Sequence, residues 1–450
     1  MPTRIDGRGS PDSRSQRQPR DRTWIFISIV TVGVVLTGMA YSLWWAPVVR
    51  HSFDYWIVPG DLLGTARAAT YIGNGYVSYL YSLQTALVTL PGFAIAFAPV
   101  VKLSQVLHLV PATSRLSLPR PSEWLLIGPV SMATSAVALV GLDRLARTLG
   151  APRVRRRMLL LVEAAAIWEV GVIWGHPEDV IALGLGALAL SRAIEGRTVS
   201  AAWFLGGALA MQLYAVLLVP VLIGLVGTRK SLPLLARAAV APGALLLAML
   251  IPDAHGTLHT ILNQPNFPKV DHPTPWVLVA PHLGHGVVAA GPGRLIGLGA
   301  ACVLGFLAAR HRDDPRTIVW LAAAALALRC LTEAVMDPYY VAPAIALALV
   351  AVAPCSWRRW LPVVAAGAAL TVLTYYRPGI WWYWLEMAGA FIVLLAPGWR
   401  WRRAPAPLQE VAEAVPDSDA QAPLELDAPG TGAVRSLAMV SPGAMDVEAP

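Results

Sequence analysis

The chain has 450 residues, of which 56% are hydrophobic and 14% are charged. This is far more apolar than a water-soluble domain needs to fill its core, so the composition excludes an ordinary soluble protein and favours one surrounded by lipid. The formal net charge of +8 comes from arginines in short clusters between apolar segments, which argues against nucleic acid as a partner.

The two ends of the chain differ from the rest. Residues 1–23 are rich in Ser, Pro and Arg without apolar periodicity, which predicts a disordered basic arm on the cytoplasmic side. The apolar run from Trp24 to about Ala46 lacks a small-residue cleavage site and is long for a signal peptide, so we interpret it as a retained first helix. Residues 404–450 are rich in Pro, Ala and acid, which predicts a disordered cytoplasmic tail after a transmembrane domain at 24–403.

Clusters of Arg and Lys between the apolar segments predict the cytoplasmic loops. They are Arg153 to Arg157, Arg192 with Arg197, Arg229 with Lys230, Arg310 to Arg316, Arg358 with Arg359, and Arg400 to Arg403. Alternation then places the following segments outside the cytoplasm: 47–84, 174–179, the turn near Gln212, 253–291, 337–340 and 375–384. We therefore predict an all-α, multi-pass bundle of about 11 to 13 membrane segments, with short helices in the external loops.

Two segments do not fit simple alternation. The segment 85–107 carries Pro91, Pro99 and Lys102 and would add an odd crossing, so we expect a re-entrant or interface-lying helix there. The run 201–226 is too long for one helix and has arginines on both sides, which predicts a break or hairpin near Gln212.

Three titratable groups fall within four residues of the turn WGHPED, namely His176, Glu178 and Asp179. Acids at the start of a helix also complement its dipole, which is the simpler explanation of this cluster. No second cluster with ligand spacing accompanies the turn, and the three cysteines have no metal-like spacing, so we predict no metal site.

The other external segments supply acids, cations and aromatic groups. Asp54, Asp61 and Arg67 lie in the first loop with several tyrosines, although an ordinary loop with interfacial tyrosines would look the same. Arg329 stands four residues before Glu333, close enough to pair with it on one helix. Candidate donors to an anionic phosphate on this side are Arg67, Lys269, Arg329 and Arg377, and His272 lies in a polar, proline-rich loop that suits sugar contacts.

Several stretches, taken together, resemble polyprenyl-phosphate-sugar-dependent bacterial glycosyltransferases of the C superfamily, in particular their mannosyltransferases. The stretches are PGDLLGTARAA, a Pro-containing apolar helix after it, WGHPEDVIALGLGALAL and GGALAMQLYAVLLVP. The resemblance covers residues 25–400 and is strongest over 59–225. It rests on this overall pattern rather than on one unique motif.

The resemblance implies transfer of a sugar, expected to be mannose, from a polyprenyl phosphate to a lipid or glycan acceptor outside the cytoplasm, with inversion. It implies that Asp61, with Asp54 as the alternative, acts as the base on the acceptor hydroxyl. His176, Glu178 and Asp179 look like the second external polar turn of such enzymes, where His176 would hydrogen-bond the phosphate or the sugar and Glu178 or Asp179 would hold its ring. Where the family commonly has a lysine, this chain has Met211 and Gln212, which is a departure from the family's pattern.

On this interpretation, Arg67, Arg329 and Arg377 are candidates to stabilise the leaving phosphate. No cofactor is predicted, because the donor is already activated. A secondary transporter and a non-catalytic membrane scaffold remain the alternative functions, although the sequence lacks the two related halves typical of a transporter. The abundance of Ala and Arg favours a GC-rich bacterial source and a cell-membrane location, while the sugar, acceptor and linkage are left open.

Overall fold

The computed structural model describes residues 22–49, 60–81, 87–109, 126–269, 271–376 and 378–399. These residues all belong to one compact unit, Met1–Trp401. Asp54, Arg377, nearly all of the predicted basic arm and the whole predicted acidic tail lie outside the described residues.

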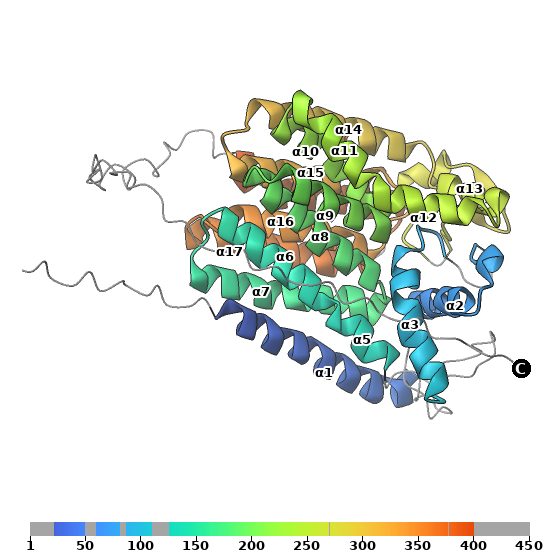
Figure 1. Cartoon of the computed structure of the whole chain (residues 1–450). Coiled ribbons are helices and arrows are strands. Elements are labelled where there is room, and N and C mark those ends of the chain that lie inside the picture. Colours follow the sequence, from blue (N-terminus) through green and yellow to red (C-terminus); the bar gives the residue numbers. More distant parts are fainter. Residues whose placement is uncertain are drawn as a thin grey trace, which may run out of the picture. The chain divides into compact units, whose positions relative to one another are not determined.

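The described residues form a bundle of α-helices, which confirms the predicted all-α membrane fold (Figure 1). Five helices are long and apolar enough to cross a membrane. They are α1 (Thr23–Val49), α11 with α12 (Thr228–Ala238 and Val240–Leu250), α14 (Gly293–Arg310), α15 (Pro315–Thr332) and α18 (Ile380–Trp399). Each keeps its backbone hydrogen bonds within the helix, which is what a lipid environment requires.

Shorter elements complete the bundle. The α-helices are α2 (Gly60–Gly73), α3 (Gly92–Val106), α5 (Ile127–Ala133), α6 (Ser135–Thr148), α7 (Arg153–Trp168), α8 (Pro177–Ile194), α9 (Thr198–Met211), α10 (Leu218–Val226), α13 (Ala254–Asn263), α16 (Ala342–Val352) and α17 (Trp357–Leu373). The 3-10 turns are η1 (Val77–Tyr79), η3 (Leu213–Leu217), η4 (Pro275–Leu278) and η5 (Pro338–Val341), and the π-turn is η2 (Glu169–Trp174). The only strands among the described residues are β1 (His282–Gly284) and β2 (Val287–Val288), which pair antiparallel.

Small residues allow the central helices to approach closely. A Cβ atom added to Gly141 of α6 would clash with the carbonyl of Gly184 in α8, and one added to Gly224 of α10 would clash with the carbonyl of Gly305 in α14. Lipid supplies little hydrophobic drive for association, so close backbone packing of this kind holds such bundles together.

The predicted break near Gln212 is confirmed, and the segment 85–107 contains a helix. Helix α9 ends at Met211, Gln212 is extended at φ −150° and ψ 132°, and η3 leads into α10. Helix α3 contains Pro99 and packs on α2, beside the ends of the long helices rather than among them (Figure 1). Whether α3 lies at the membrane interface or re-enters the membrane stays a prediction.

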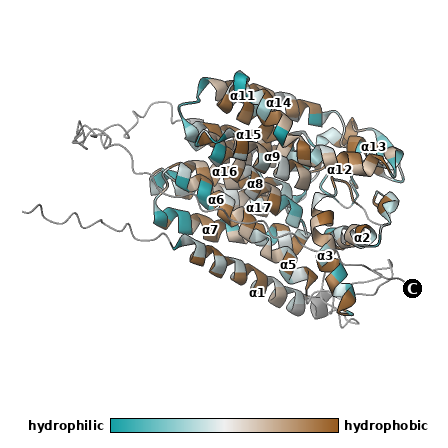
Figure 2. Ribbon diagram, in the orientation of Figure 1, coloured by the Kyte–Doolittle hydropathy of each residue, from teal (hydrophilic) through white to brown (hydrophobic). Residues whose placement is uncertain are grey.

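Hydrophilic residues gather at two opposite ends of the bundle (Figure 2). Helix α7 begins at Arg153 and leads to the turn at His176, from which α8 returns to Arg192. Helices α14 and α15 are likewise joined through Arg310 and its neighbours. We call the end with these arginine turns the arginine-rich end, and the end that contains residues 174–179 the pocket end. Which end faces the cytoplasm stays a prediction from the positive-inside rule.

Candidate functional site

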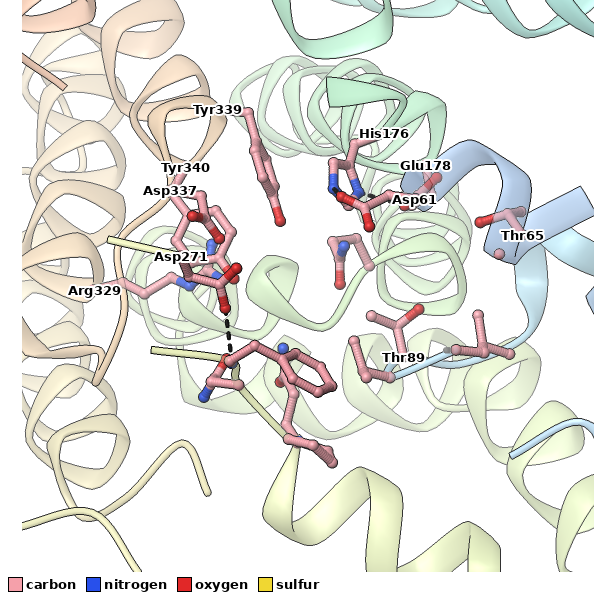
Figure 3. A pocket seen from close by; sticks show the side chains of 18 residues that line it. Asp61, Thr65, Thr89, His176, Glu178, Asp271, Arg329, Asp337, Tyr339 and Tyr340 are labelled. Atoms are coloured by element: carbon pink, nitrogen blue, oxygen red, sulfur yellow. Dashed lines mark hydrogen bonds and ion pairs between the residues drawn. The ribbon is translucent and has the colours of Figure 1, made fainter. Parts of the chain in front are cut away.

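A polar pocket of about 140 Å³ lies at the pocket end (Figure 3). It is lined from α2, the α7–α8 turn, the α9–η3 turn, the loop after α13, and the connection between α15 and α16. Pockets for drug-sized ligands usually measure about 300 to 1,000 Å³. The polar pocket is therefore sized for one small polar group, and any longer part of a ligand has to extend out of it.

His176 joins two carboxylates from different parts of the chain. Its Nε2 lies 2.9 Å from Oδ2 of Asp61, and its Nδ1 lies 2.8 Å from Oε1 of Glu178. Asp61 stands in the first turn of α2, where the helix dipole favours an acid, and 58% of its side chain is exposed. Gly175 adopts a left-handed conformation at φ 75°, which ends the π-turn and aims the following His176 at α2.

The two carboxylates favour the charged form of His176. Burial opposes the imidazolium, but the hydrogen bonds to Asp61 and Glu178 outweigh it and raise the pKa of His176 well above its usual value. As an imidazolium, His176 donates a hydrogen bond from each ring nitrogen, one to each carboxylate. Its ring also stacks on Tyr339, with the centroids 4.0 Å apart, so its orientation is fixed on three sides.

The side chain of Gln212 lines the pocket and is bound to Asp179, the last of the three titratable residues in the turn. Its Nε2 donates to Oδ2 of Asp179 at 3.0 Å, and its Oε1 accepts from the backbone N–H of Leu213. Tyr214 donates its hydroxyl hydrogen to the backbone carbonyl of Asp179 at 2.9 Å. The break after α9 therefore positions the first turn of α8.

Arg329 forms the opposite wall, across the pocket from Asp61 (Figure 3). Its Nε donates to Oε1 of Glu333 at 3.1 Å, and its guanidinium carbon lies 4.4 Å from the ring centre of Tyr340 and 5.6 Å from that of Tyr214. Within the described part of the chain, neither terminal nitrogen of Arg329 has a hydrogen-bond acceptor. This guanidinium can therefore accept an anionic ligand without losing a protein contact.

Two further aspartates line the pocket. Asp337 is buried, and its Oδ1 lies 3.4 Å from Nδ1 of His272. Oδ2 of Asp271 accepts from the backbone N–H of Phe267 at 2.8 Å and so closes the loop at the mouth (Figure 3). His272 itself is buried behind Asp337 and does not line the pocket, so any action on a ligand would pass through Asp337.

The structure brings five predicted site residues around one pocket: Asp61, His176, Glu178, Gln212 and Arg329. Asp179 lies directly behind them, within 3.6 Å of His176. Arg67 lies on α2 but does not line the pocket.

Sequence reasoning missed several lining residues as site candidates, among them Thr65, Thr89, Asn266, Asp337, Tyr339 and Tyr340. Thr65 follows Asp61 by one helical turn, so helical spacing would have found it.

The turn at His176 has the groups that a divalent cation needs. Ligand atoms of His176, Glu178 and Asp179 lie within 4.8 Å of one another. Oε2 of Glu178 is buried and has no hydrogen-bond partner among the described residues. One imidazole and two carboxylates would suit Zn²⁺ or Mn²⁺. However, Nδ1 of His176 and Oε1 of Glu178 already share a proton in their hydrogen bond. A metal ion at this turn would therefore have to displace that proton.

A second cavity offers no comparable chemistry. A groove of about 600 Å³ lies between α15 and α18 and is lined by aliphatic and aromatic side chains such as Leu328, Leu331 and Phe391. Its one polar side chain, the indole of Trp320, already donates to the carbonyl of Leu395 at 2.9 Å. The polar pocket is therefore the candidate site.

No model of a known protein family matches this sequence, and no curated protein matches it.

Proposed function

We propose that this protein is an integral membrane glycosyltransferase. It would move a sugar, expected to be mannose, from a polyprenyl phosphate donor to a lipid or glycan acceptor on the non-cytoplasmic side. The observation that supports this best is the pairing, across one small pocket, of a half-exposed carboxylate on Asp61 with a buried guanidinium on Arg329. Transfer from a phosphate-linked sugar needs a base on one side of the reacting carbon and an anion-stabilising group on the other.

Asp61 is suited to the role of base. His176 binds Oδ2 of this carboxylate, and Oδ1 has no partner among the described residues, so it is available to an acceptor hydroxyl. The hydroxyl proton would pass to Asp61 as the acceptor oxygen bonds to the anomeric carbon. The bond from that carbon to the phosphate oxygen would break with its electron pair, and attack from the opposite face would invert the centre.

Arg329 is suited to stabilising the departing phosphate. Burial strengthens its interaction with a developing negative charge, and its contacts with Glu333 and Tyr340 hold it in place before the reaction. The acids and amides between the two walls, including Asp337 and Asn266, are suited to hydrogen bonds with sugar hydroxyls. The lipid chain of the donor would remain outside, since a pocket of about 140 Å³ lined by polar groups does not suit a long apolar chain.

The test is Asp61→Asn in the full chain, assayed for transfer of labelled sugar from a polyprenyl phosphate donor. Asn can accept the same hydrogen bond from His176 but cannot take a proton, so we expect the turnover rate to fall by about 10² to 10⁴. Donor KM should stay within a few fold. Asp313→Asn, which changes an exposed aspartate at the arginine-rich end, is the matched control and should transfer normally.

Two outcomes would reject the proposal. Transfer by Asp61→Asn at the wild-type rate would remove the base from the mechanism. Accumulation of a solute in sealed vesicles by a wild-type protein that glycosylates nothing would identify a transporter instead.

A further inference from the structure

Glu333 is shared by two arginines from different helices. Its Oε1 accepts from Nε of Arg329 at 3.1 Å, and its Oε2 accepts from Nε of Arg294, at the start of α14, at 3.0 Å. Only 5% of the Glu333 side chain is exposed, against 13% for Arg329 and 27% for Arg294. The carboxylate is therefore the most buried member of this triad.

The triad carries a net positive charge. One carboxylate faces two guanidiniums, so the charges of Glu333 and one arginine cancel and a single positive charge is left at the edge of the pocket. Both arginines use only Nε in these contacts, and the terminal nitrogens of Arg329 have no acceptor among the described residues. Carboxylates also line the pocket, so what the triad offers an anion is the terminal nitrogens of Arg329.

The backbone of Glu333 is also held in place. Thr274 donates its hydroxyl hydrogen to the carbonyl of Glu333 at 2.5 Å and its backbone N–H to the carbonyl of Ala334 at 3.0 Å. Glu333 itself leaves the helix in an extended conformation directly after α15. The loop that carries Asp271 on the pocket wall therefore also fixes the carboxylate that orients Arg329.

We infer that Glu333 is a positioning residue that holds the Arg329 guanidinium for a phosphate group in the pocket. Arg294 occupies the second oxygen of Glu333, so the carboxylate does not fully neutralise Arg329. This inference rests on the proposed function, and it assigns the phosphate of the donor to the Arg329 wall. A shift in the Glu333 carboxylate would move the guanidinium away from the phosphate without removing either charge.

The experiment measures binding of a radiolabelled polyprenyl phosphate without a sugar to the full chain in lipid nanodiscs, with inorganic phosphate as competitor. Arg329→Gln should weaken binding about 100-fold and Glu333→Asp about tenfold, because the shorter side chain keeps the charge but withdraws the carboxylate. The double variant should bind no more weakly than Arg329→Gln alone, because Glu333 acts through Arg329. In the transfer assay, Glu333→Asp should raise donor KM and also lower kcat, because Arg329 both binds the donor phosphate and stabilises the charge that develops on it.

Glu195 provides the matched control. Its carboxylate is also shared by arginines but at the arginine-rich end: it accepts hydrogen bonds from Arg144 and Arg192, and Arg197 lies 3.8 Å away. Glu195→Asp should therefore leave polyprenyl phosphate binding unchanged, and melting temperatures of the two Glu→Asp variants would identify any loss of folding.

The outcomes separate the two proposals. Wild-type binding by Glu333→Asp together with lost binding by Arg329→Gln would overturn the positioning role alone. The inference would also fail if the two substitutions weakened binding independently, with additive effects. Absence of binding by the wild-type protein would overturn the proposed donor class, and the inference with it.

Discussion

Buried charges at the arginine-rich end are paired differently from those at the pocket end. Arg156 donates two hydrogen bonds of 2.7 Å to the two oxygens of Asp143, and only 4% of its side chain is exposed. At the pocket end, Arg329 has a single contact to Glu333 through Nε, and one oxygen of Glu178 has no partner among the described residues.

The difference separates structural ion pairs from a site that can accept a ligand. A bidentate pair such as Arg156 with Asp143 satisfies both charges, and the Arg156 guanidinium also donates to the hydroxyl of Thr23. At the pocket end, by contrast, some donors and acceptors have no partner among the described residues. Unpaired polar groups destabilise a fold, and proteins retain them chiefly at sites that bind ligands or catalyse reactions. The following substitutions test this contrast.

Breaking the bidentate pair should give the largest loss of stability. Asp143→Asn leaves the Arg156 guanidinium buried without its carboxylate, so we expect a loss of about 3 to 5 kcal/mol in unfolding free energy. Thermal unfolding in nanodiscs would measure this, with Asp313→Asn as the control. Transfer per folded molecule should stay normal, and a wild-type melting temperature in Asp143→Asn would contradict the structural role of the pair.

The pocket end should respond to pH near neutrality through His176. Because the pKa of His176 is raised in the folded protein, its stabilisation is fully present below the unfolded pKa of about 6.5 and is lost as pH rises through the folded pKa. The arginine pairs stay charged throughout this range. We expect His176→Gln to lose about 1.5 to 3 kcal/mol at neutral pH and less as the pH rises.

Melting temperatures of the wild type and His176→Gln between about pH 6 and pH 10 would measure this effect. The gap between the two proteins should close at the alkaline end. A constant gap would mean that His176 is not held as an imidazolium.

Two caps, one at each end, should give the smallest effects. Gln212 accepts from the backbone N–H of Leu213, and Asp314 accepts from the backbone N–H groups of Arg316 and Thr317. Gln212→Ala and Asp314→Ala should each cost about 1 kcal/mol of stability. Only Gln212→Ala should also raise donor KM, by a few fold, because Gln212 additionally holds Asp179. Initial rates over a range of donor concentrations would show this, and an equal rise in Asp314→Ala would remove the distinction between the ends.

The sequence by itself determined the class of fold and indicated several residues that line the candidate site. Apolar runs long enough to span lipid can satisfy their backbone groups only as helices, so the all-α bundle follows from composition. The break near Gln212 also followed from the sequence, because one apolar run was too long for a single helix. Asp61 and the turn at His176 were recognised because several titratable groups stand out within apolar surroundings.

Only the tertiary structure decided which of those residues meet. Asp61 and His176 are 115 positions apart, and their 2.9 Å contact depends on how α2 packs at the end of the bundle. The same packing excluded Arg67 from the pocket and set His272 behind Asp337. It also joined Arg294 to Glu333, a partner that helical spacing could not reveal. Local spacing specifies neighbours along one helix, whereas contacts between helices depend on side-chain packing over the whole bundle.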